Sequence, residues 1–393
     1  MKIAILTCGI LPVPAVQGGA VENLIDFYLE YNDWKKLHDI TVYSPWDERA
    51  EKHPALSSDI NHYIFIDVTS RKARITRRLY RFLHNNEYYN YFIEYYFEKI
   101  YSILKHQQYD CILLENCPGY AYKLSLRGYN NLVLHLHNEL LHSTSRYHDM
   151  IFNGLNKILT VSDYIKGRVA TIRTSDKIQT IHNGIDLNNF TIKKNNTISR
   201  KDVGFYDDDF VMVYSGRINK EKGVSELIDA ILQLKDHPNI KLMVIGGSFF
   251  GNTKNEDEFI LQLKEKAKAI QDKIVFTGFI PYEKMPDYLQ IADIAVIPSI
   301  WNDPFPTTEL EAQAMGLPII TTRRGGIPEE VDENNAILLE TDEHLIANLT
   351  SAILDLYQHP EKREQMAKAS IERARLFDKE TFARNFFEAL ESF

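Results

Sequence analysis

Short apolar runs alternate along the chain with longer segments in which apolar residues recur at helical spacing. The short runs are rich in Val, Ile and Leu and are bounded by polar residues, which predicts strands. Residues 2–6, 40–43, 63–66, 111–114, 132–136, 157–161, 211–214, 241–245, 274–276, 294–297 and 318–321 form these runs. Residues 21–31 and 91–104 have the spacing of amphipathic helices. Continuous apolar strands that alternate with helices indicate parallel sheets covered on both faces.

The alternation occurs twice, so the pattern predicts two Rossmann-like α/β domains, each with a doubly wound parallel sheet. The first domain is predicted at residues 1–182 and the second at residues 205–374. Residues 183–204 between them are polar, rich in Asn and Lys, and without a sustained period, which is typical of a linker. From Pro360 onward the chain is predicted to be helical throughout, with an apolar stripe of Phe377, Phe382, Phe386, Phe387 and Leu390.

Composition narrows the class of protein without changing this picture. The hydrophobic and charged fractions, 44% and 25%, are those of a globular protein, and 393 residues suffice for two domains. The net charge of −9 argues against general nucleic-acid binding. Cys8, Cys111 and Cys117 offer neither a disulfide framework nor metal-ligand spacing, so a cytoplasmic protein is expected. The apolar start at residues 1–11 is too short to span a bilayer and lacks the cleavage site of a signal peptide.

Residues 301–316 carry the most specific chemical pattern in the chain. Asp303 and Glu311 flank a Pro-Phe-Pro turn and the first turn of a helix. A helix N-terminus offers N–H donors to a phosphate, and carboxylates accept hydrogen bonds from sugar hydroxyls. The segment therefore suits a phosphorylated sugar. Thr308 and Glu311 also have the spacing of a capping box, which would explain them as an ordinary helix start.

This segment resembles the E-x7-E signature of the retaining glycosyltransferases of family 4, also called group 1, which have the GT-B fold. In that fold two Rossmann-like domains face each other across a cleft. The last helix, here about residues 375–393, is expected to pack back on the first domain. The chain departs from the family pattern at Asp303, where Glu is usual, and at Pro306, where Gly is usual.

The resemblance implies roles for residues within the signature. Glu311 would accept hydrogen bonds from the ribose hydroxyls of a nucleotide sugar. Asp303 would contact hydroxyls of the transferred sugar, although Asp reaches one methylene less far than Glu. The backbone N–H groups of Phe305, Thr307 and Thr308 would face the sugar and the phosphates.

The loop after the strand at 211–214 adds positive charge. Gly216 allows a ligand to approach the backbone closely, and Arg217 and Lys222 place two cations near the next helix start. Two cations at a helix start suit a diphosphate. The spacing matches the family pattern of Gly-Arg followed by Lys-Gly. The alternative is a solvated basic loop.

Three further segments of the second domain bear on the donor. Ile280 lies in residues 276–281, which resemble the strand-end loop whose backbone contacts the nucleobase in the family. Residues 245–247 end a strand, where they could face the base or form a simple turn. Residues 325–329 resemble the glycine-rich turn after the signature helix, although Pro328 and Glu329 also make an ordinary helix start.

In the first domain, two segments match the acceptor side of the family. Gly18 and Gly19 follow the first strand and precede a helix, as in the family loop that lies against the donor phosphate and the acceptor. His137 ends a strand and matches the family's strand-end histidine. His135 lies on the same strand face, because side chains alternate. The alternative for His137 is a hydrogen-bonded core histidine.

The resemblance implies a front-face displacement in which the leaving diphosphate takes the proton of the acceptor. Arg217, Lys222 and the helix N-terminus would stabilise the developing charge, while His137 and Asp303 would contact the sugar. No metal and no cofactor are expected. Residues 207–209 form an Asp-Asp-Asp run similar to a D-x-D metal motif, but they are predicted to lie in a solvated turn.

The expected donor is a nucleotide sugar, with a UDP-sugar as the first candidate and GDP- and dTDP-sugars as alternatives. The expected acceptor is a saccharide or a lipid-linked saccharide, in the synthesis of cell-surface polysaccharide or glycoconjugate. A sugar-nucleotide epimerase of the same fold and a non-catalytic nucleotide-binding scaffold are the competing interpretations. A dehydrogenase is disfavoured, because no G-x-G-x-x-G follows the first strand of either domain.

A basic cluster interrupts the acidic chain and suggests a membrane partner. It consists of Arg71, Lys72, Arg74, Arg77, Arg78 and Arg81, and residues 88–97 that follow are rich in Tyr and Phe. Basic residues are attracted to anionic lipid, and amphipathic rings favour bilayer interfaces. This pattern predicts peripheral contact with the inner face of the membrane. The alternative is a basic surface helix beside an aromatic core helix.

Overall fold

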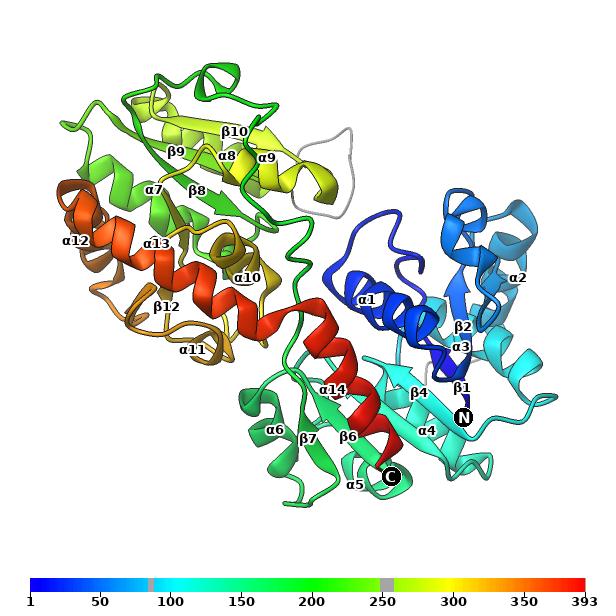
Figure 1. Ribbon diagram of the computed structural model, residues 1–393. Coiled ribbons are helices and arrows are strands. Elements are labelled where there is room, and N and C mark those ends of the chain that lie inside the picture. The colour runs from blue at the N-terminus through cyan, green and yellow to red at the C-terminus, as the bar shows by residue number, and fades with distance from the viewer. Residues whose placement is uncertain (84–87, 248–257, 393) are drawn as a thin grey trace. The chain divides into compact units, whose positions relative to one another are not determined.

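The computed structural model describes residues 1–83, 88–247 and 258–392 and divides into two compact α/β units (Figure 1). The first unit comprises Met1–Asn183 together with Glu380–Phe393, and the second comprises Gly184–Lys379. Each unit is built on one parallel sheet. The predicted class, two parallel-sheet α/β domains, is therefore confirmed.

The sheet of the first unit has the strand order β3-β2-β1-β4-β5-β6-β7. Its strands are β1 (Lys2–Leu6), β2 (Asp39–Pro45), β3 (Asn61–Ile66), β4 (Cys111–Glu115), β5 (Leu132–Leu136), β6 (Lys157–Thr160) and β7 (Ile178–Thr180). The helices that accompany it are α1 (Ala20–Lys35), α2 (Arg71–Leu83), α3 (Tyr91–Leu104), α4 (Pro118–Leu126), α5 (His148–Gly154), α6 (Asp163–Ala170) and α14 (Lys379–Glu391).

The sheet of the second unit has the order β10-β9-β8-β11-β12-β13. Its strands are β8 (Phe210–Ser215), β9 (Ile240–Ile245), β10 (Ile274–Gly278), β11 (Ile294–Ile297), β12 (Ile319–Thr322) and β13 (Ala336–Leu339). The helices are α7 (Val224–Gln233), α8 (Glu258–Lys266), α9 (Met285–Leu289), α10 (Thr307–Ala314), α11 (Ile327–Glu330), α12 (Leu345–Gln358) and α13 (Pro360–Ala374). In both sheets the strand order reverses direction beside the first strand, β1 or β8, where open α/β sheets bind ligands.

The apolar pattern did not predict β7 and β13. Both are short edge strands, and each pairs with a neighbour on one side only. Their side chains are partly exposed, so neither has the continuous apolar character that identified the central strands. The missing strands extend the two sheets without changing their class.

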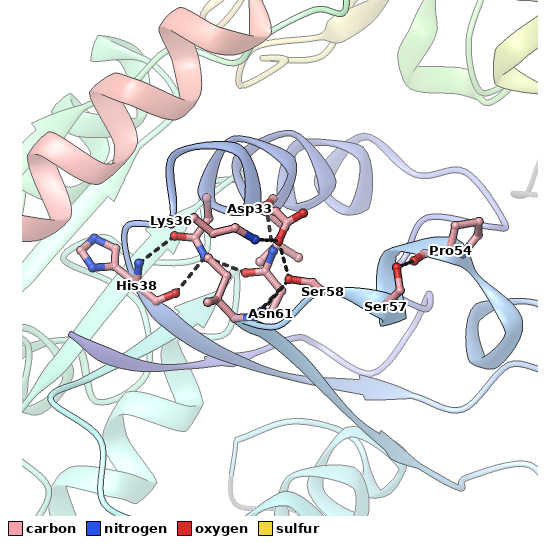
Figure 2. Close-up of polar contacts among 10 residues, drawn as sticks. Asp33, Lys36, His38, Pro54, Ser57, Ser58 and Asn61 are labelled. Atoms are coloured by element: carbon pink, nitrogen blue, oxygen red, sulfur yellow. Dashed lines mark hydrogen bonds and ion pairs between the residues drawn. The ribbon is translucent and has the colours of Figure 1, made fainter.

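The end of α1 is tied to the start of β3 by polar side chains (Figure 2). The Asn32 amide donates to Asn61 Oδ1 at 2.7 Å and to the His38 carbonyl at 3.0 Å. Ser58 Oγ and Lys36 Nζ both donate to Asp33 Oδ1, at 2.6 and 3.0 Å. Because two of these bonds join α1 to Ser58 and Asn61, they fix the end of the helix against the start of β3. The other end of α1 carries the Gly-Gly loop.

The sequence predicted a C-terminal segment that is helical throughout, but the structure interrupts it. A 3-10 turn at Arg375–Phe377 follows α13, and Asp378 adopts an extended conformation before α14 begins. Phe386 of α14 stacks on Tyr28 of α1 with ring centroids 4.2 Å apart, inside the core of the first unit. Phe377 instead packs against Phe305 in the second unit, at 5.7 Å. The predicted single stripe is therefore divided between two cores.

Candidate functional site

Backbone groups form a tightly packed edge where β8, β9 and β10 end. The Gly216 N–H donates to the Ile245 carbonyl at 3.1 Å, and the Gly246 N–H donates to the Gly278 carbonyl at 2.9 Å. Gly216 and Gly246 both have φ 138°. A Cβ at Gly246 would lie 1.9 Å from the Gly216 carbonyl oxygen, so a side chain is sterically excluded there. A ligand at this edge would meet bare backbone on two strands.

The turn after β8 brings a lysine to the signature segment. Lys222 Nζ forms an ion pair with Asp303 Oδ2, and the two side chains are 14% and 10% exposed. The turn ends at Gly223, which has φ 70°, and a Cβ there would lie 1.9 Å from the Pro298 carbonyl oxygen. The backbone carbonyl of Asp303 accepts a 2.7 Å hydrogen bond from Gly326. Both charges are therefore held in place, 81 residues apart in sequence.

Helix α10 begins beside this ion pair without a side-chain cap. Pro306 occupies the N-cap position, and no side chain there accepts from the first turn. The capping box between Thr308 and Glu311 is not formed, since Thr308 lies within α10 and is not its N-cap; its Oγ1 donates to the adjacent Glu309 at 2.8 Å. The interpretation of this motif as an ordinary capped helix start was therefore wrong. An uncapped N-terminus next to a lysine attracts anions.

Three carboxyl groups are buried around the start of α10. Burial raises the pKa of Glu311 to about 8. Burial and, secondarily, the Asp303 charge raise the pKa of Glu309 to about 8. Burial also raises the pKa of Glu330 well above its ordinary value, and neither of its oxygens has a hydrogen-bond partner among the described residues. At neutral pH these groups favour the protonated form, so they do not cancel the positive field of the helix end.

Arg217 and Ile280 complete the predicted donor residues of the second unit. Arg217 is exposed at the end of β8, and its carbonyl accepts a 2.8 Å hydrogen bond from the Tyr214 hydroxyl. Ile280 is half-buried two residues beyond Gly278, at the end of β10. Both follow strands at the same sheet edge as Gly216, because the carboxyl ends of parallel strands share an edge.

The Asp run at 207–209 lies at the other end of β8 and is not uniformly solvated. Asp209 is buried, and its carboxylate accepts the Tyr206 N–H at 2.7 Å. Asp207 pairs with Lys201 at 3.0 Å on the surface. The run therefore forms a structured turn, and the prediction of a fully solvated loop was wrong for Asp209.

In the first unit, the predicted Gly-Gly loop leads into α1 with positive φ at both residues, 74° for Gly18 and 113° for Gly19. A Cβ at Gly19 would lie 2.2 Å from Oε2 of Glu22, so the glycine makes room for this carboxyl group. Burial raises the pKa of Glu22 to about 7, which is the range of a proton-exchanging group at neutral pH. The sequence analysis did not identify Glu22, although its place three residues after Gly19 in the first helical turn marked it.

A polar cluster lies where β4 and β5 end. Glu115 and His135 are register partners on these strands, and His137 follows on the same face. His137 Nε2 lies 2.9 Å from Glu115 Oε2, and His135 Nδ1 lies 3.2 Å from the same oxygen. The Tyr28 hydroxyl donates to Glu115 Oε1 at 2.9 Å. The strand-end position of Glu115 was the only sequence feature that marked it.

Burial and the neighbouring polar groups together set the charge states in this cluster. Burial opposes ionisation of Glu115, but His135 and His137 hold its pKa below the usual range. Burial and, secondarily, His135 lower the pKa of His137 to about 4. Glu115, His135 and His137 are also the only described residues whose ligand atoms group within 4.8 Å in a way that could hold a metal ion.

Comparisons with known proteins agree with this geometry. The model of the glycosyl transferases group 1 matches residues 195–373, and that of glycosyltransferase family 4 matches residues 32–189. YtcC of Bacillus subtilis (strain 168) is 28% identical over all of this chain and 89% of its own length. Spore coat protein SA of the same organism is 27% identical, with 94% of this chain and 93% of that protein covered.

The chain belongs to the group 1 glycosyltransferases of family 4.

Solved structures show the same fold for this glycosyltransferase. Anabaena Alr3699/HepE in complex with UDP-glucose has a TM-score of 0.75 at 21% identity, and the match covers 100% of both chains. WaaG, a glycosyltransferase involved in lipopolysaccharide biosynthesis, has a TM-score of 0.70 at 14% identity and the same coverage of both chains. The family assignment favours glycosyl transfer over the epimerase, dehydrogenase and scaffold alternatives.

The basic cluster of the glycosyltransferase forms α2, and three of the aromatic residues after it do not have the predicted place at a membrane. Tyr95, Tyr96 and Phe97 of α3 are buried in the first unit, so they cannot lie at a bilayer interface. The exposed apolar side chains belong to α2 itself, where Ile75, Leu79 and Phe82 are 60%, 57% and 87% exposed. Among the described residues, no helix has the length and apolar character needed to cross a bilayer.

Proposed function

We propose that the protein is a retaining, metal-independent glycosyltransferase that transfers a sugar from a nucleotide-sugar donor to a saccharide or lipid-linked saccharide. One observation carries this proposal: Lys222 and Asp303 are held together at the uncapped N-terminus of α10. A cation and free N–H groups suit the diphosphate, while a carboxylate suits sugar hydroxyls. The UDP-glucose complex of the similar Anabaena protein supports a UDP-sugar as the first donor to test.

The chemistry required of these residues is stabilisation of the leaving group. The bond between the anomeric carbon and the diphosphate oxygen breaks, and both electrons stay with the diphosphate. Lys222, Arg217 and the N–H groups of α10 stabilise the added negative charge. The acceptor hydroxyl bonds to the anomeric carbon from the same face, and its proton passes to the departing diphosphate oxygen. Because protein cations stabilise the charge, no metal ion is required.

When a diphosphate takes Lys222 as its partner, the carboxylate of Asp303 becomes available to the sugar. The ion pair in the ligand-free chain keeps the lysine in place and leaves neither of the two largely buried charges unpaired before the donor binds. Glu311 would accept from the ribose, since it is buried and its only side-chain hydrogen bond among the described residues, from Thr307 Oγ1, is long at 3.5 Å.

Product analysis with labelled donors tests the proposal. UDP-, GDP- and dTDP-sugars would be incubated in EDTA with candidate saccharide and polyprenol-linked acceptors. We expect a UDP-sugar to be consumed and its sugar transferred with the anomeric configuration retained, as measured by proton NMR of the product. Inverted product, or activity that is lost in EDTA and restored by Mn²⁺, would contradict the proposed mechanism.

The exposed face of α2 supports peripheral contact with an anionic membrane. Ile75, Leu79 and Phe82 recur at helical spacing, so they form an apolar stripe, and the exposed Lys72 and Arg78 supply positive charge. The helix contains no acidic residue. Each basic residue near an anionic surface contributes on the order of 1 kcal/mol, so the helix is suited to hold the enzyme near a lipid-linked acceptor.

Vesicle co-sedimentation tests this contact. Wild-type protein should bind vesicles that contain anionic phospholipid at low salt and release them at high salt. Phe82→Ser and Lys72→Glu/Arg78→Glu should each weaken binding. Arg77 is a poor choice for this test, because its guanidinium donates to the Val68 carbonyl at 3.2 Å and lies over Phe92. Equal binding by these variants and the wild type would remove α2 as the contact.

A further inference from the structure

Glu115 is an enclosed hydrogen-bond acceptor with three partners. Its side chain is 1% exposed, and Tyr28, His135 and His137 all reach its two oxygens. An ionised carboxylate can only accept hydrogen bonds. The contacting atoms, Nδ1 of His135 and Nε2 of His137, must therefore each carry a proton.

The protonation of His137 follows from this arrangement. Its lowered pKa makes the imidazole neutral at pH 7, so the ring carries one proton, and that proton is on Nε2. The other nitrogen, Nδ1, then carries a lone pair and no proton, and it makes no hydrogen bond with a described residue. His137 is the more exposed of the two histidines, since His135 is fully buried. The open atom of this cluster is thus an acceptor.

The backbone of His137 is held as firmly as its ring. Asn116 has φ 57°, and its Oδ1 accepts the His137 N–H at 3.1 Å. The Asn116 N–H donates to the His135 carbonyl at 2.8 Å. Tyr28, which bonds to Glu115 from α1, is itself stacked on Phe386. The position and the rotation of the imidazole are therefore both fixed.

We propose that Glu115 is a positioning residue that holds His137 as the neutral Nε2–H tautomer, so that Nδ1 accepts a hydrogen bond from a sugar hydroxyl. The inference rests on the proposed glycosyl transfer and names the group that His137 recognises. The opposite tautomer or an imidazolium would present an N–H at the same place, and an N–H cannot accept from a hydroxyl. The carboxylate acts through the histidine and need not touch the substrate.

A metal ion in this cluster would require the opposite tautomers. Metal ligation by His135 Nδ1 and His137 Nε2 would need lone pairs on both atoms and would place the protons on the other nitrogens. The proton of His135 would then lie on Nε2, a buried atom with no hydrogen-bond partner among the described residues. Burying an N–H without an acceptor is costly, whereas the proposed tautomer leaves only a lone pair there.

Long-range proton–nitrogen NMR on the full chain labelled with ¹⁵N-histidine reads the tautomer directly. We expect the wild-type His137 signals at pH 7 to show a neutral ring with its proton on Nε2, assigned by their loss in His137→Asn. Glu115→Gln turns an N–H₂ group toward one of the rings and should move the His137 proton to Nδ1 in part or completely. Tyr28→Phe removes a bond to the other carboxylate oxygen and should leave the tautomer unchanged.

Turnover separates positioning from a purely structural role. Glu115→Gln should lower kcat for sugar transfer about 10–10²-fold, the loss expected for a misdirected contact to substrate, and leave the Kd for UDP within about twofold. In the His137→Asn variant, the amide oxygen of the new side chain can take the place of Nδ1. Adding Glu115→Gln to this variant should have no further effect on kcat.

Three results would overturn the inference. A wild-type His137 that is charged or protonated on Nδ1 contradicts it without any variant having to fold. A Glu115→Gln variant with unchanged tautomer and kcat also contradicts it. One zinc per chain by elemental analysis, lost in Glu115→Gln, would assign the cluster to a metal. If no nucleotide sugar is turned over at all, the proposed function fails, and the NMR still decides the tautomer.

Discussion

Glu309 in the second unit and Glu115 in the first are both fully buried, yet they have opposite charge preferences. Burial raises the pKa of Glu309 to about 8, and within the described part of the chain its side-chain hydrogen-bond partners are the hydroxyls of Thr308 and Thr321. Burial also opposes ionisation of Glu115, but its pKa is lowered, because two imidazoles lie against its carboxylate. Burial alone therefore does not decide ionisation. The number and kind of donors around the carboxyl group decide it.

The difference suits what each sheet edge binds. Neutral carboxyl groups around α10 leave the lysine and the helix end free to attract a diphosphate. A charged carboxylate beside His137 holds a neutral ring in one tautomer. Substitutions in each unit should therefore affect different steps, donor binding in the second and orientation of the sugar in the first.

The largest effect is expected at the cation of the second unit. Lys222→Ala should lower kcat/KM with the nucleotide sugar by roughly 10²–10³-fold, because it removes a preorganised charge from the leaving group. Lys220→Ala is the matched control, since Lys220 is exposed on the same turn. Steady-state kinetics measure both. A Lys222→Ala variant as active as Lys220→Ala would remove the donor-site assignment.

A smaller effect on catalysis is expected at the two histidines, and it should divide by role. His137→Ala should lower kcat about 10–10²-fold with little change in UDP affinity, because the histidine lies outside the unit that carries the donor residues. His135→Ala should mainly lower the thermal midpoint, because it leaves buried Glu115 without one donor. If His135→Ala abolishes transfer in a stable protein and His137→Ala is silent, the roles are reversed.

Two glycines where the strands of the second unit end, Gly246 and Gly278, should differ in how much an alanine destabilises the unit. Gly246→Ala places a Cβ against the Gly216 carbonyl and should destabilise the unit by roughly 2 kcal/mol or more. Gly278→Ala meets no atom within 4 Å, so only its left-handed backbone conformation opposes the change, at about 1 kcal/mol. Denaturant melts compare the two. Equal losses would mean that the close approach of β8 and β9 is not rigid.

A pH dependence of stability should distinguish Glu309 from Glu115. The pKa of Glu309 is about 8 in the folded chain, above the ordinary value of about 4.3 for an unfolded glutamate. The folded state therefore retains the proton longer, and stability falls as pH rises from about 4.3 to about 8, by about 1.4 kcal/mol per pH unit for one such group.

Glu309→Gln cannot ionise and should remove this loss. Its thermal midpoint should lie nearest that of the wild type at or below pH 5 and exceed it increasingly toward pH 8, at about 2–4 °C per kcal/mol for a domain of this size. Glu343→Gln is the control, because the Glu343 side chain is 82% exposed. A difference between Glu309→Gln and wild type that does not grow with pH would show that Glu309 is ionised in the folded chain.

The sequence predicted the fold well because buried parallel strands are continuous apolar runs. It missed β7 and β13, since short edge strands with partly exposed side chains lack that pattern. Lys222 and Asp303 were both identified from motifs. Their ion pair could not be predicted, because it depends on how the turn after β8 packs against Pro298.

The buried glutamates around the site are the main feature that the sequence did not predict. For Glu309 and Glu330 no local sequence feature indicated burial, and for Glu22 and Glu115 the only indication was their place in the first turn of a helix or at the end of a strand. For Tyr95, Tyr96 and Phe97 the error was the opposite one, because exposed positions were predicted for side chains that are buried. Their composition suited a bilayer interface, whereas the helical period of α3 turns them into the core.

Calorimetric titration of UDP in EDTA tests the central claim most directly, because it needs neither the right sugar nor an acceptor. We expect wild-type protein and Lys220→Ala to bind UDP with the same Kd, and Lys222→Ala to bind at least about 10-fold more weakly, as expected for a lost charge-assisted bond. Undiminished binding by Lys222→Ala, or binding by wild-type protein only when a divalent metal is added, would contradict the account.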